Sequence, residues 1–482
     1  MQERGLLFVG GEWVAPSTNR VIEVVSPHSE QVIARIAAPA AEDVDRAVDA
    51  ARKAFEEGPW PRLAPSERVA AVRRLSESYE PLREEAARLI TAEMGAPITF
   101  SRSTQAHLPW AMMRAFADIA VGFPWEENRP GFFGRDVIVQ REPLGVVSAI
   151  VPWSMPLLLA VMKLVPALLA GCPVVLKPSS RTPLDAYLLA ELLEQADLPP
   201  GLVSVLPGGR ELGRYLVSHF GVDKVSFTGS ADAGWQVAAA CGAAFKPVGL
   251  ELGGKSAAVV LDDADPAAVA AGIRASGLAN GGQTCVAQTR ILVPRNRYGT
   301  FVDALASMVA SLTVGDPYDP ATEVGPLASR QQQERVRGHI ERGREEGARL
   351  ITGGTDLPDG IDRGWYVRPT LFTDVDSEMR IAQEEVFGPV LTVIPYRDEE
   401  EAIRIADDTP YGLSGSVWTP DLDRGLAVAR RVRSGTFGIN QAYNMDPAAP
   451  FGGVKDSGMG RELGKEGIEG YLEVKSISIA LP

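Results

Sequence analysis

The alternation of short apolar segments with longer helical patterns between residues 147 and 251 most constrains the fold of this chain. Strands are predicted over 147–151, 173–177, 203–206, 224–227 and 247–250, and helices over 156–170, 183–196, 210–219 and 231–241. Strands that alternate with helices at this length form a parallel, doubly wound sheet whose ligand binds at the carboxyl ends of the strands. The sequence therefore predicts an α/β fold.

A second strand–helix series begins near Ser256 and continues to about residue 445. Its first predicted strands are 257–261 and 290–293, and its first predicted helices are 265–280 and 296–312. A helix over 40–56 and another that begins near Ser66 precede the first series. Because 482 residues are too many for one core, we expect two or three domains.

Two further segments alternate like exposed strands. Residues 135–141 follow the turn Asn128-Arg129-Pro130-Gly131 in the manner of a hairpin arm, and the tail alternates over 472–479. Exposed strands associate with other strands, and a partner subunit is the natural candidate. The pattern thus predicts a β-arm for oligomerisation.

Charge and composition argue against several classes of partner. The formal net charge of −14 disfavours nucleic acid and anionic membranes, since both prefer a basic face. Cys172, Cys241 and Cys285 lie far apart without a C-x-x-C pair, which disfavours a disulfide framework and indicates a reducing compartment. The four histidines have no metal-ligand spacing, so we expect no metal.

No segment has the pattern of a signal peptide or a membrane span. The N-terminus lacks a basic region followed by a long apolar run. The most apolar segment, 157–169, contains Lys163 and Pro166 and is too short to cross a bilayer, so it is predicted to be a buried helix. We therefore expect a cytoplasmic protein.

Cys285 lies in a context that favours chemistry. It ends the stretch Gly282-Gln283-Thr284-Cys285, whose small residues leave it accessible, and a carboxylate opens the stretch Glu251-Leu252-Gly253-Gly254-Lys255. A thiol can attack a carbonyl carbon, and a carboxylate can activate the water that releases the product. A small buried apolar role for Cys285 is the alternative. A Cys–His hydrolase is also open, because its partners need only meet in space.

Three other motifs stand at predicted strand ends or turns. Phe227-Thr228-Gly229-Ser230 ends a strand, where Gly229 allows a ligand to approach and the next helix offers N–H groups to a phosphate. Lys177-Pro178-Ser179-Ser180 also ends a strand, where a lysine can hold a ribose. Glu384-Glu385-Val386-Phe387-Gly388-Pro389 places an acidic pair before an aromatic residue and a turn. Each motif alone is compatible with an ordinary loop.

Together and in this order, the motifs closely resemble the aldehyde dehydrogenase superfamily. The matching stretches are Pro152-Trp153, Lys177, Phe227-Thr228-Gly229-Ser230, Glu251-Leu252-Gly253-Gly254-Lys255, Gly282-Gln283-Thr284-Cys285, Glu385-x-Phe387-Gly388-Pro389 and Pro450-Phe451-Gly452-Gly453. The resemblance covers essentially the whole chain, and the glutamate and cysteine motifs are its most specific parts.

The resemblance implies NAD(P)-dependent oxidation of an aldehyde to the carboxylic acid, without coenzyme A. By similarity, Cys285 attacks the aldehyde, the thiohemiacetal loses hydride to a nicotinamide, and water activated by Glu251 hydrolyses the thioester. The thiolate needs N–H groups or positive charge nearby to lower its pKa. Two alternatives are a coenzyme A-acylating enzyme, which the retained Glu251 argues against, and a cofactor-binding protein with little catalysis.

The resemblance also assigns residues to the cofactor, which is NAD or NADP. The assigned residues are Lys177 and Glu385 at the two riboses, Gly229 and Ser230 at the pyrophosphate, Trp153 along the cleft, and Phe387 near the nicotinamide. Core packing is the alternative for the two aromatic residues. Lys255 is expected to be structural.

Two positions depart from the commonest family pattern. Ser154 replaces an asparagine that, with the backbone N–H of Cys285, stabilises the oxyanion, and we expect this to slow turnover. Ser180 replaces a glutamate that repels a 2′-phosphate, and Arg181 or Arg210 adds positive charge nearby. We therefore expect NADP to be tolerated, with NAD still possible.

The family pattern also places an aldehyde tunnel. The residues expected to line it are Met155, Leu158, Met162, Met445 and Phe451, with Thr284 and Val286 beside the nucleophile. Methionines form an adaptable apolar wall without charge, which favours a medium-chain, terpenoid or aromatic aldehyde. The alternative is that these residues are simply core.

The implied architecture has three parts. A doubly wound, Rossmann-like cofactor domain is assembled from residues 1–122 and 142–251, and an α/β catalytic domain spans 252–445. An arm (123–141) and the C-terminal segment (446–482) form the oligomerisation element. The family assembles as homodimers or homotetramers, and the sequence does not choose between them.

Overall fold

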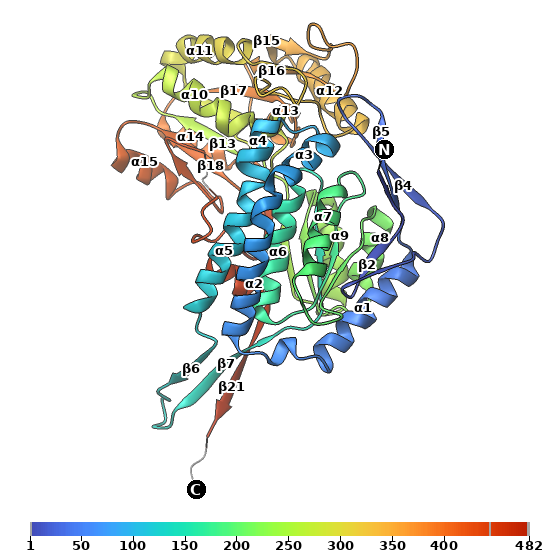
Figure 1. Cartoon of the computed structure of the whole chain (residues 1–482). Helices are drawn as coiled ribbons and strands as arrows, with labels where there is room; N and C mark the ends of the chain where they lie inside the picture. Colours follow the sequence, from blue (N-terminus) through green and yellow to red (C-terminus); the bar gives the residue numbers. More distant parts are fainter. Residues whose placement is uncertain (1, 443–444, 480–482) are drawn as a thin grey trace.

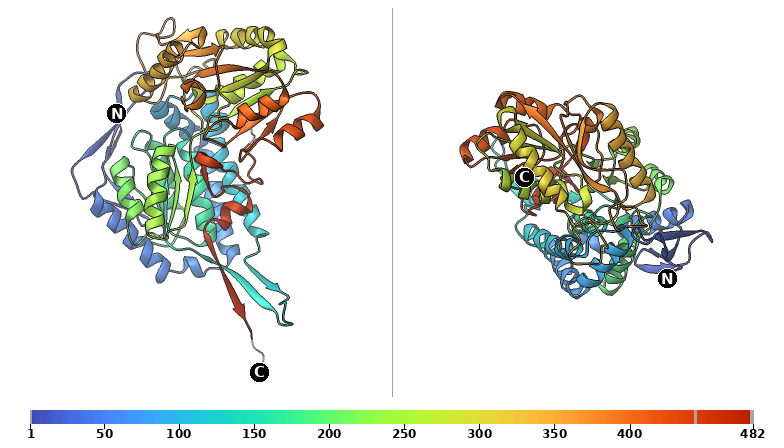
Figure 2. Two further views of the ribbon diagram at one scale, coloured as in Figure 1. Left: turned by 180° about the vertical axis from the view of Figure 1, so that it is seen from behind. Right: turned by 90° about the horizontal axis from the view of Figure 1, so that it is seen from above.

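The structure, a computed structural model, describes residues 2–442 and 445–479. It has two lobes, each built on a sheet with helices on both faces, and a three-stranded sheet projects away from them (Figure 1). Further views show the second strand–helix series, in yellow and orange, in a lobe of its own beside the first (Figure 2). The predicted doubly wound α/β class is confirmed.

The first sheet has eight strands in the order β20-β12-β11-β8-β9-β10-β2-β3. Its five central strands run parallel, whereas β20 and β2 join antiparallel at either side. Its strands are β2 (Leu7–Val9), β3 (Glu12–Val14), β8 (Val147–Ile150), β9 (Val174–Lys177), β10 (Val203–Val205), β11 (Lys224–Thr228), β12 (Val248–Glu251) and β20 (Gly458–Met459). The parallel strands read as short apolar runs because both faces of the sheet are covered.

Two apolar layers cover this sheet. The larger one is centred on α6 (Pro156–Ala170), whose side chains are all buried, and also contains residues of α2 (Pro65–Tyr79), α3 (Arg83–Met94), α5 (His107–Val121) and α7 (Leu184–Gln195). The opposite layer contains residues of α1 (Ala41–Glu56), α8 (Arg210–Ser218) and α9 (Ala231–Ala243). Helices on both faces leave the carboxyl edge of the sheet as the place where a ligand can bind.

The second lobe repeats this arrangement. Its seven strands follow the order β15-β16-β17-β14-β13-β18-β19 and are parallel except for β15. The strands are β13 (Ala257–Val260), β14 (Arg290–Pro294), β15 (Arg349–Gly354), β16 (Arg368–Thr373), β17 (Val390–Tyr396), β18 (Gly415–Trp418) and β19 (Gly438–Ile439). Its helices are α10 (Pro266–Gly277), α11 (Tyr298–Ala310), α12 (Arg330–Glu345), α13 (Arg380–Gln383), α14 (Glu399–Asp407) and α15 (Leu422–Ala429).

The remaining elements lie outside the two large sheets. A small sheet has the order β1-β5-β4, and two short helices occur at other points of the chain. The elements are β1 (Gln2–Arg4), β4 (Val21–Val25), β5 (Val32–Ala37), α4 (Ile98–Phe100) and α16 (Gly464–Glu469). No helix within residues 2–442 and 445–479 is long and apolar enough to cross a membrane.

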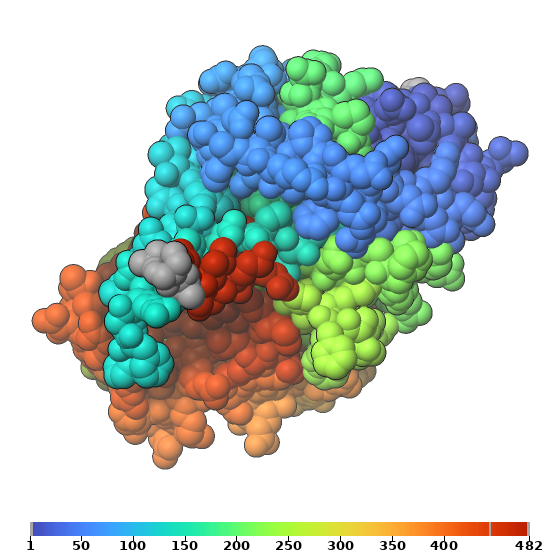
Figure 3. Space-filling model, turned by 90° about the horizontal axis from the view of Figure 1, so that it is seen from below, coloured from blue at the N-terminus to red at the C-terminus, as the bar shows by residue number. Residues whose placement is uncertain are grey.

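The arm and the tail pair with each other. β6 (Glu126–Arg129) and β7 (Val137–Pro143) form the predicted hairpin, and β21 (Leu472–Ser478) runs antiparallel to β7. Figure 3 shows the arm and the tail side by side on the underside of the molecule. The two strands thus pair with each other within the chain, and the association of this sheet with a partner subunit stays a prediction.

The largest difference from the predicted elements is at the end of α10. The periodicity predicts a helix to residue 280, but the helix ends at Gly277. Asn280, Gly281 and Gly282 have φ values of 55°, 63° and 71°, in the left-handed region. A run of left-handed residues cannot continue an α-helix, so the chain turns sharply just before Cys285.

Candidate active site

The strand order brings the predicted motifs of the first lobe to one edge. β8 lies between β11 and β9, and β12 follows β11 on the far side. Lys177 ends β9 and Glu251 ends β12, and the loops after β8 and β11 carry Trp153 and Ser230. Because the carboxyl ends of parallel strands share an edge, residues separated by up to a hundred positions lie along one edge of the sheet, the candidate cofactor site.

The segment that carries Cys285 is tied to the loop after β8. The side-chain amide of Asn280 donates hydrogen bonds to the backbone oxygens of Ser154, at 3.1 Å, and Gln283, at 3.2 Å. The side-chain oxygen of Gln283 accepts from the N–H of Ala328 at 3.0 Å. Asn280 was not among the predicted site residues, although an asparagine before two glycines is a signal for a left-handed turn.

Cys285 is partly exposed and packs against the apolar layer around α6. Burial of the thiol, together with the carboxylates of Glu385 and Glu251, raises its pKa to about 12. The backbone N–H groups of Cys285 and Val286 act in the opposite direction but do not outweigh them. The expectation of a lowered thiol pKa is therefore wrong, and the thiol needs a base before it can attack.

Glu251 ends β12 and is 4% exposed. Burial raises the pKa of its carboxyl well above the usual range, the charge of Glu462 adds to this, and Lys163 and Arg461 oppose it. Its Oε2 has no hydrogen-bond partner in the part of the chain that the structure describes. A buried carboxyl with a raised pKa and a free oxygen is suited to accept a proton near neutral pH.

Lys163 and Glu462 form a buried ion pair beside this carboxyl. Lys163 lies on α6 and is fully buried, and its ammonium donates to the carboxylate of Glu462, which is 299 positions away in the sequence. In the sequence, Lys163 is the one charged residue of the apolar segment 157–169, and such a buried cation predicts an acidic partner. No sequence pattern identifies Glu462 as that partner.

Lys177 ends β9 with its ammonium buried. It donates to the backbone oxygens of Gly208, at 2.5 Å, and Pro178, at 3.1 Å, and burial lowers its pKa to about 8. Ser180 is partly buried in the turn that follows β9. An ammonium whose partners are neutral carbonyls can also donate to the hydroxyls of a ribose.

Gly229 and Ser230 form the turn between β11 and α9. The N–H of Gly229 donates to the backbone oxygen of Glu251 at 3.1 Å, and a Cβ on Gly229 would lie 2.5 Å from the ring of Phe227. Ser230 caps α9 by accepting from the N–H of Ala233. The turn thus directs the positive end of a 13-residue helix to the carboxyl edge of the sheet.

Glu385 and Phe387 contact the candidate cofactor site from the second lobe. Oε1 of Glu385 accepts from the N–H of Gly254 at 3.0 Å, and burial raises the pKa of this carboxyl. Phe387 has a φ of 58°, and its ring meets that of Trp153 edge-on with centroids 5.4 Å apart. The side-chain amide of Gln332, which the sequence did not indicate, donates to the backbone oxygen of Phe387 at 2.8 Å and holds this strained segment.

The residues expected to line the tunnel mostly share one cluster. Leu158, Met162 and Phe451 are buried within the layer around α6, and Met155, Val286 and Met445 are partly buried against it. Thr284 is partly buried in the nucleophile segment. Because Cys285 packs on the same layer, the carbon that it attacks would be surrounded by apolar groups.

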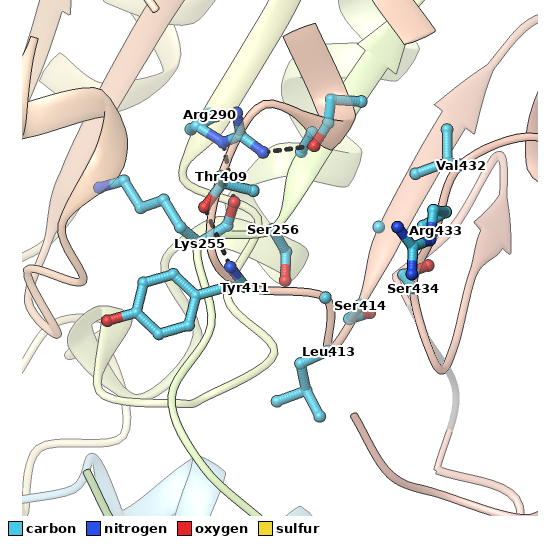
Figure 4. Close-up of a pocket in the computed structure, with 14 residues that line it drawn as sticks. Lys255, Ser256, Arg290, Thr409, Tyr411, Leu413, Ser414, Val432, Arg433 and Ser434 are labelled. Atoms are coloured by element: carbon cyan, nitrogen blue, oxygen red, sulfur yellow. Dashed lines mark hydrogen bonds between the residues drawn. The ribbon is translucent and has the colours of Figure 1, made fainter. Parts of the chain in front are cut away.

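Lys255 belongs to a separate, small cavity of about 10 Å³, which is room for about one water molecule. Figure 4 shows Lys255 extending away from Ser414 and Arg433, while Arg290 bonds to backbone oxygens. Lys255 is 2% exposed, and burial together with Arg290 lowers its pKa to about 7. The cavity lies behind the glutamate motif and does not contain Cys285 or Glu251.

The candidate cofactor site fits a dinucleotide. It combines a buried ammonium at Lys177, a helix N-terminus at Ser230 and a buried carboxylate at Glu385. These groups suit the hydroxyls of one ribose, a pyrophosphate and the hydroxyls of a second ribose, respectively. Gly253 permits this packing, since a Cβ there would lie 2.6 Å from Oε2 of Glu385.

A dinucleotide site next to a cysteine and a buried glutamate defines a class of protein. It is the class of oxidoreductases that bind their substrate covalently to a cysteine thiol. Comparison with known proteins identifies the family. The family model described as "Aldehyde dehydrogenase family" matches residues 13–477. The chain belongs to the aldehyde dehydrogenase family and is an NAD(P)-dependent oxidoreductase.

Known relatives extend over the full length of the chain. The geranial dehydrogenase of Castellaniella defragrans is 46% identical over 98% of both chains. The aldehyde dehydrogenase of Mycobacterium tuberculosis, solved with NAD+, is 48% identical with a TM-score of 0.97 over 99% of both chains. A mutant of aldehyde dehydrogenase C from Pseudomonas syringae, solved with NAD+ and octanal, is 41% identical with a TM-score of 0.95 over 98% of this chain and 96% of that one.

Proposed function

We propose that this protein oxidises apolar aldehydes to carboxylic acids through a covalent intermediate on Cys285. The observation that carries the proposal is the closeness of Glu251 to Cys285, where the carboxylate raises the pKa of the thiol and apolar side chains pack around the sulfur. Formation of NAD(P)H from a panel of aldehydes, with and without coenzyme A, tests it. Turnover that requires coenzyme A would favour an acylating enzyme, and cofactor binding without turnover would favour a binding protein.

The first half of the reaction uses both residues. The carboxylate of Glu251 accepts the proton of the Cys285 thiol, whose raised pKa keeps it protonated in the free enzyme. The sulfur bonds to the carbonyl carbon, and the backbone N–H of Cys285 and the hydroxyl of Ser154 stabilise the resulting oxyanion. Lys177, Ser230 and Glu385 would hold NAD or NADP, which would supply the acceptor for the hydride that this carbon loses as it becomes a thioester.

The second half releases the acid. Glu251 first releases the thiol proton to solvent and is a carboxylate again. It then accepts a proton from water, the hydroxide adds to the thioester carbon, and the carbon–sulfur bond breaks. The raised pKa of Glu251 makes it a stronger base than an exposed glutamate. The cysteine sulfur leaves as the thiolate, which takes up a proton.

The substrate class follows from the apolar wall around the nucleophile. Medium-chain, terpenoid and aromatic aldehydes are favoured, since the assigned tunnel residues carry no charge. The names of the relatives support this proposal, because one acts on geranial and another is solved with octanal. Sugar phosphates and cationic aldehydes are expected to be poor substrates.

We expect Ser154→Asn to raise the rate of aldehyde oxidation. A serine hydroxyl on a short stem is a weaker oxyanion donor than an asparagine amide, and one such donor is worth about 10²–10³ in rate. We predict a gain of about tenfold or more in the single-turnover rate of NAD(P)H formation, measured by stopped flow. Ser154→Ala is the matched control and should be slower than the parent. Equal rates in parent and Ser154→Asn would show that the oxyanion site is built differently.

We expect this enzyme to accept NADP. Ser180 has no carboxylate to repel a 2′-phosphate, and the exposed Arg210 begins α8 just after Gly208, the carbonyl partner of Lys177. The kcat/KM for NADP should be within about tenfold of that for NAD, a difference of about 1.4 kcal/mol or less. Ser180→Glu should lower the value for NADP alone. A strong preference of the parent for NAD would contradict this prediction.

We propose further that the protein is a cytoplasmic homodimer or homotetramer, with the domain boundaries given by the sequence. The arm sheet supports oligomerisation, because it presents the exposed side chains of Phe132, Phe133 and Val474 on a projecting element. Such apolar groups on an extended sheet are typical of a surface that associates with another subunit.

A further inference from the structure

Arg181 connects the two lobes at the candidate cofactor site. Its backbone lies in the loop between β9 and α7 of the first lobe, and its guanidinium donates to the side-chain oxygen of Gln331 on α12 of the second lobe. The same guanidinium lies over the indole of Trp153, with Cζ 6.0 Å from the ring centroid. Its backbone N–H donates to the hydroxyl of Ser179 at 3.2 Å, which fixes the loop from which it extends.

The charge of Arg181 lacks an acidic partner. No ion pair forms between Arg181 and a carboxylate of the described residues, and its pKa is lowered by burial alone. An arginine that is partly removed from water without a counter-ion is unfavourable, so most such groups are paired. Its bond to Gln331 is to a neutral amide on an exposed side chain, where water competes for both groups.

The position of Arg181 coincides with the path of the cofactor. Lys177 ends β9, Ser230 follows β11, and β8 lies between these two strands in the sheet. Trp153 follows β8. A dinucleotide that contacts both Lys177 and Ser230 must therefore pass Trp153, over which the guanidinium of Arg181 lies. The diphosphate is the anionic part of that dinucleotide, and bonds between a guanidinium and phosphate are roughly twice as strong as those to a neutral acceptor.

We propose that Arg181 is a cofactor-binding residue that binds the diphosphate. In the free enzyme its guanidinium is held by Gln331 and Trp153, and it releases Gln331 when the dinucleotide enters. This inference rests on the proposed use of NAD or NADP. Because the guanidinium is directed to Trp153 and the second lobe, the diphosphate, and not the 2′-phosphate of NADP, is its proposed contact.

Binding measurements without turnover test the proposal. The dissociation constants of NAD+ and ADP-ribose are measured by calorimetry for the parent, Arg181→Gln and Gln331→Leu. Arg181→Gln should weaken both ligands by about ten- to a hundredfold, the range for hydrogen bonds to a charged group. Gln331→Leu should not weaken either ligand, because it removes only the partner that the arginine leaves. ADP-ribose keeps the diphosphate and lacks the nicotinamide, so equal losses for both ligands identify the diphosphate as the contact.

A matched control removes an arginine charge from α12, the helix that carries Gln331. Arg330 precedes Gln331, pairs with Glu30 on the surface and has no role in the cleft, so Arg330→Gln should bind NAD+ like the parent. Thermal unfolding of each variant without ligand checks that the fold is intact.

Three results would overturn the proposal. The first is unchanged binding in Arg181→Gln, and the second is a loss for NAD+ without a loss for ADP-ribose. The third is an equal loss in Gln331→Leu, which would mean that the arginine only joins the two lobes. Because ADP-ribose binding needs no aldehyde, a failure of the proposed aldehyde oxidation would be seen separately, in the substrate panel.

Discussion

Cys285→Ala should abolish aldehyde oxidation while binding of NAD+ is retained. Without the thiol, no covalent intermediate forms, and loss of a nucleophile costs several orders of magnitude in rate, here about 10⁴-fold or more. The side chain is partly exposed and small, so its truncation should leave the fold intact. Steady-state NAD(P)H formation measures the loss, and calorimetry with NAD+ measures the retained binding.

Cys172 provides the matched control for this prediction. Cys172 is fully buried in the layer around α6, and burial raises its pKa to about 11. Both thiols are therefore protonated in the free enzyme, but only Cys285 has the carboxylate of Glu251 close enough to raise its pKa. Cys172→Ala should keep the activity of the parent. Substantial turnover by Cys285→Ala would exclude the cysteine mechanism.

Glu251→Gln should trap the enzyme as a thioester. The amide has the same shape as the carboxyl but cannot accept a proton, so release of the acid slows by about 10²–10⁴-fold, the usual contribution of a general base. Mass spectrometry of the variant mixed with aldehyde and NAD+ should show the acyl group on Cys285. Hydroxylamine attacks thioesters without a base and should restore part of the turnover. Absence of the acyl-enzyme and of this rescue would contradict the role of Glu251.

The pH dependence follows from the direction of the Glu251 pKa. The carboxylate is the active form and its pKa is raised, so the rate should increase as pH rises through that pKa. The charge of Glu462 raises this pKa, whereas Lys163 lowers it. Glu462→Gln should therefore move the rising limb to lower pH, because it removes the negative charge and leaves the cation. A shift to higher pH, or no shift, would contradict the assignment.

Much of the fold could be predicted from local patterns. The helix predicted over 156–170 coincides with α6, and the predicted strands differ from β8, β9 and β10 by a single residue at one end. Apolar periodicity is a property of neighbouring residues, so it is visible without the tertiary structure. The end of α10 was missed because periodicity alone does not show that three consecutive residues adopt left-handed conformations.

The sequence proposed members of the candidate site but not their electrostatics. Glu251, Cys285, Lys177 and Glu385 occur in recognisable stretches. In the structure the charges of Glu251 and Glu385 act on Cys285, and Lys177 ends a strand of the same sheet as Glu251. The pKa of Cys285 was predicted in the wrong direction because the N–H groups were visible in the motif, while the burial and the approach of Glu385 were not. Electrostatic effects depend on distances in space, for which the sequence has no local signal.

By itself the sequence determined the order of strands and helices, the family, and the residues proposed to face the substrate and cofactor, because these depend on short stretches of chain. Only the tertiary structure decided that β7 pairs with β21 and that Lys163 joins Glu462 across 299 positions. It also decided that Arg181 lies over Trp153 without a counter-ion. These features arise from burial and from charges that distant segments bring together, so they exist only once the chain has folded.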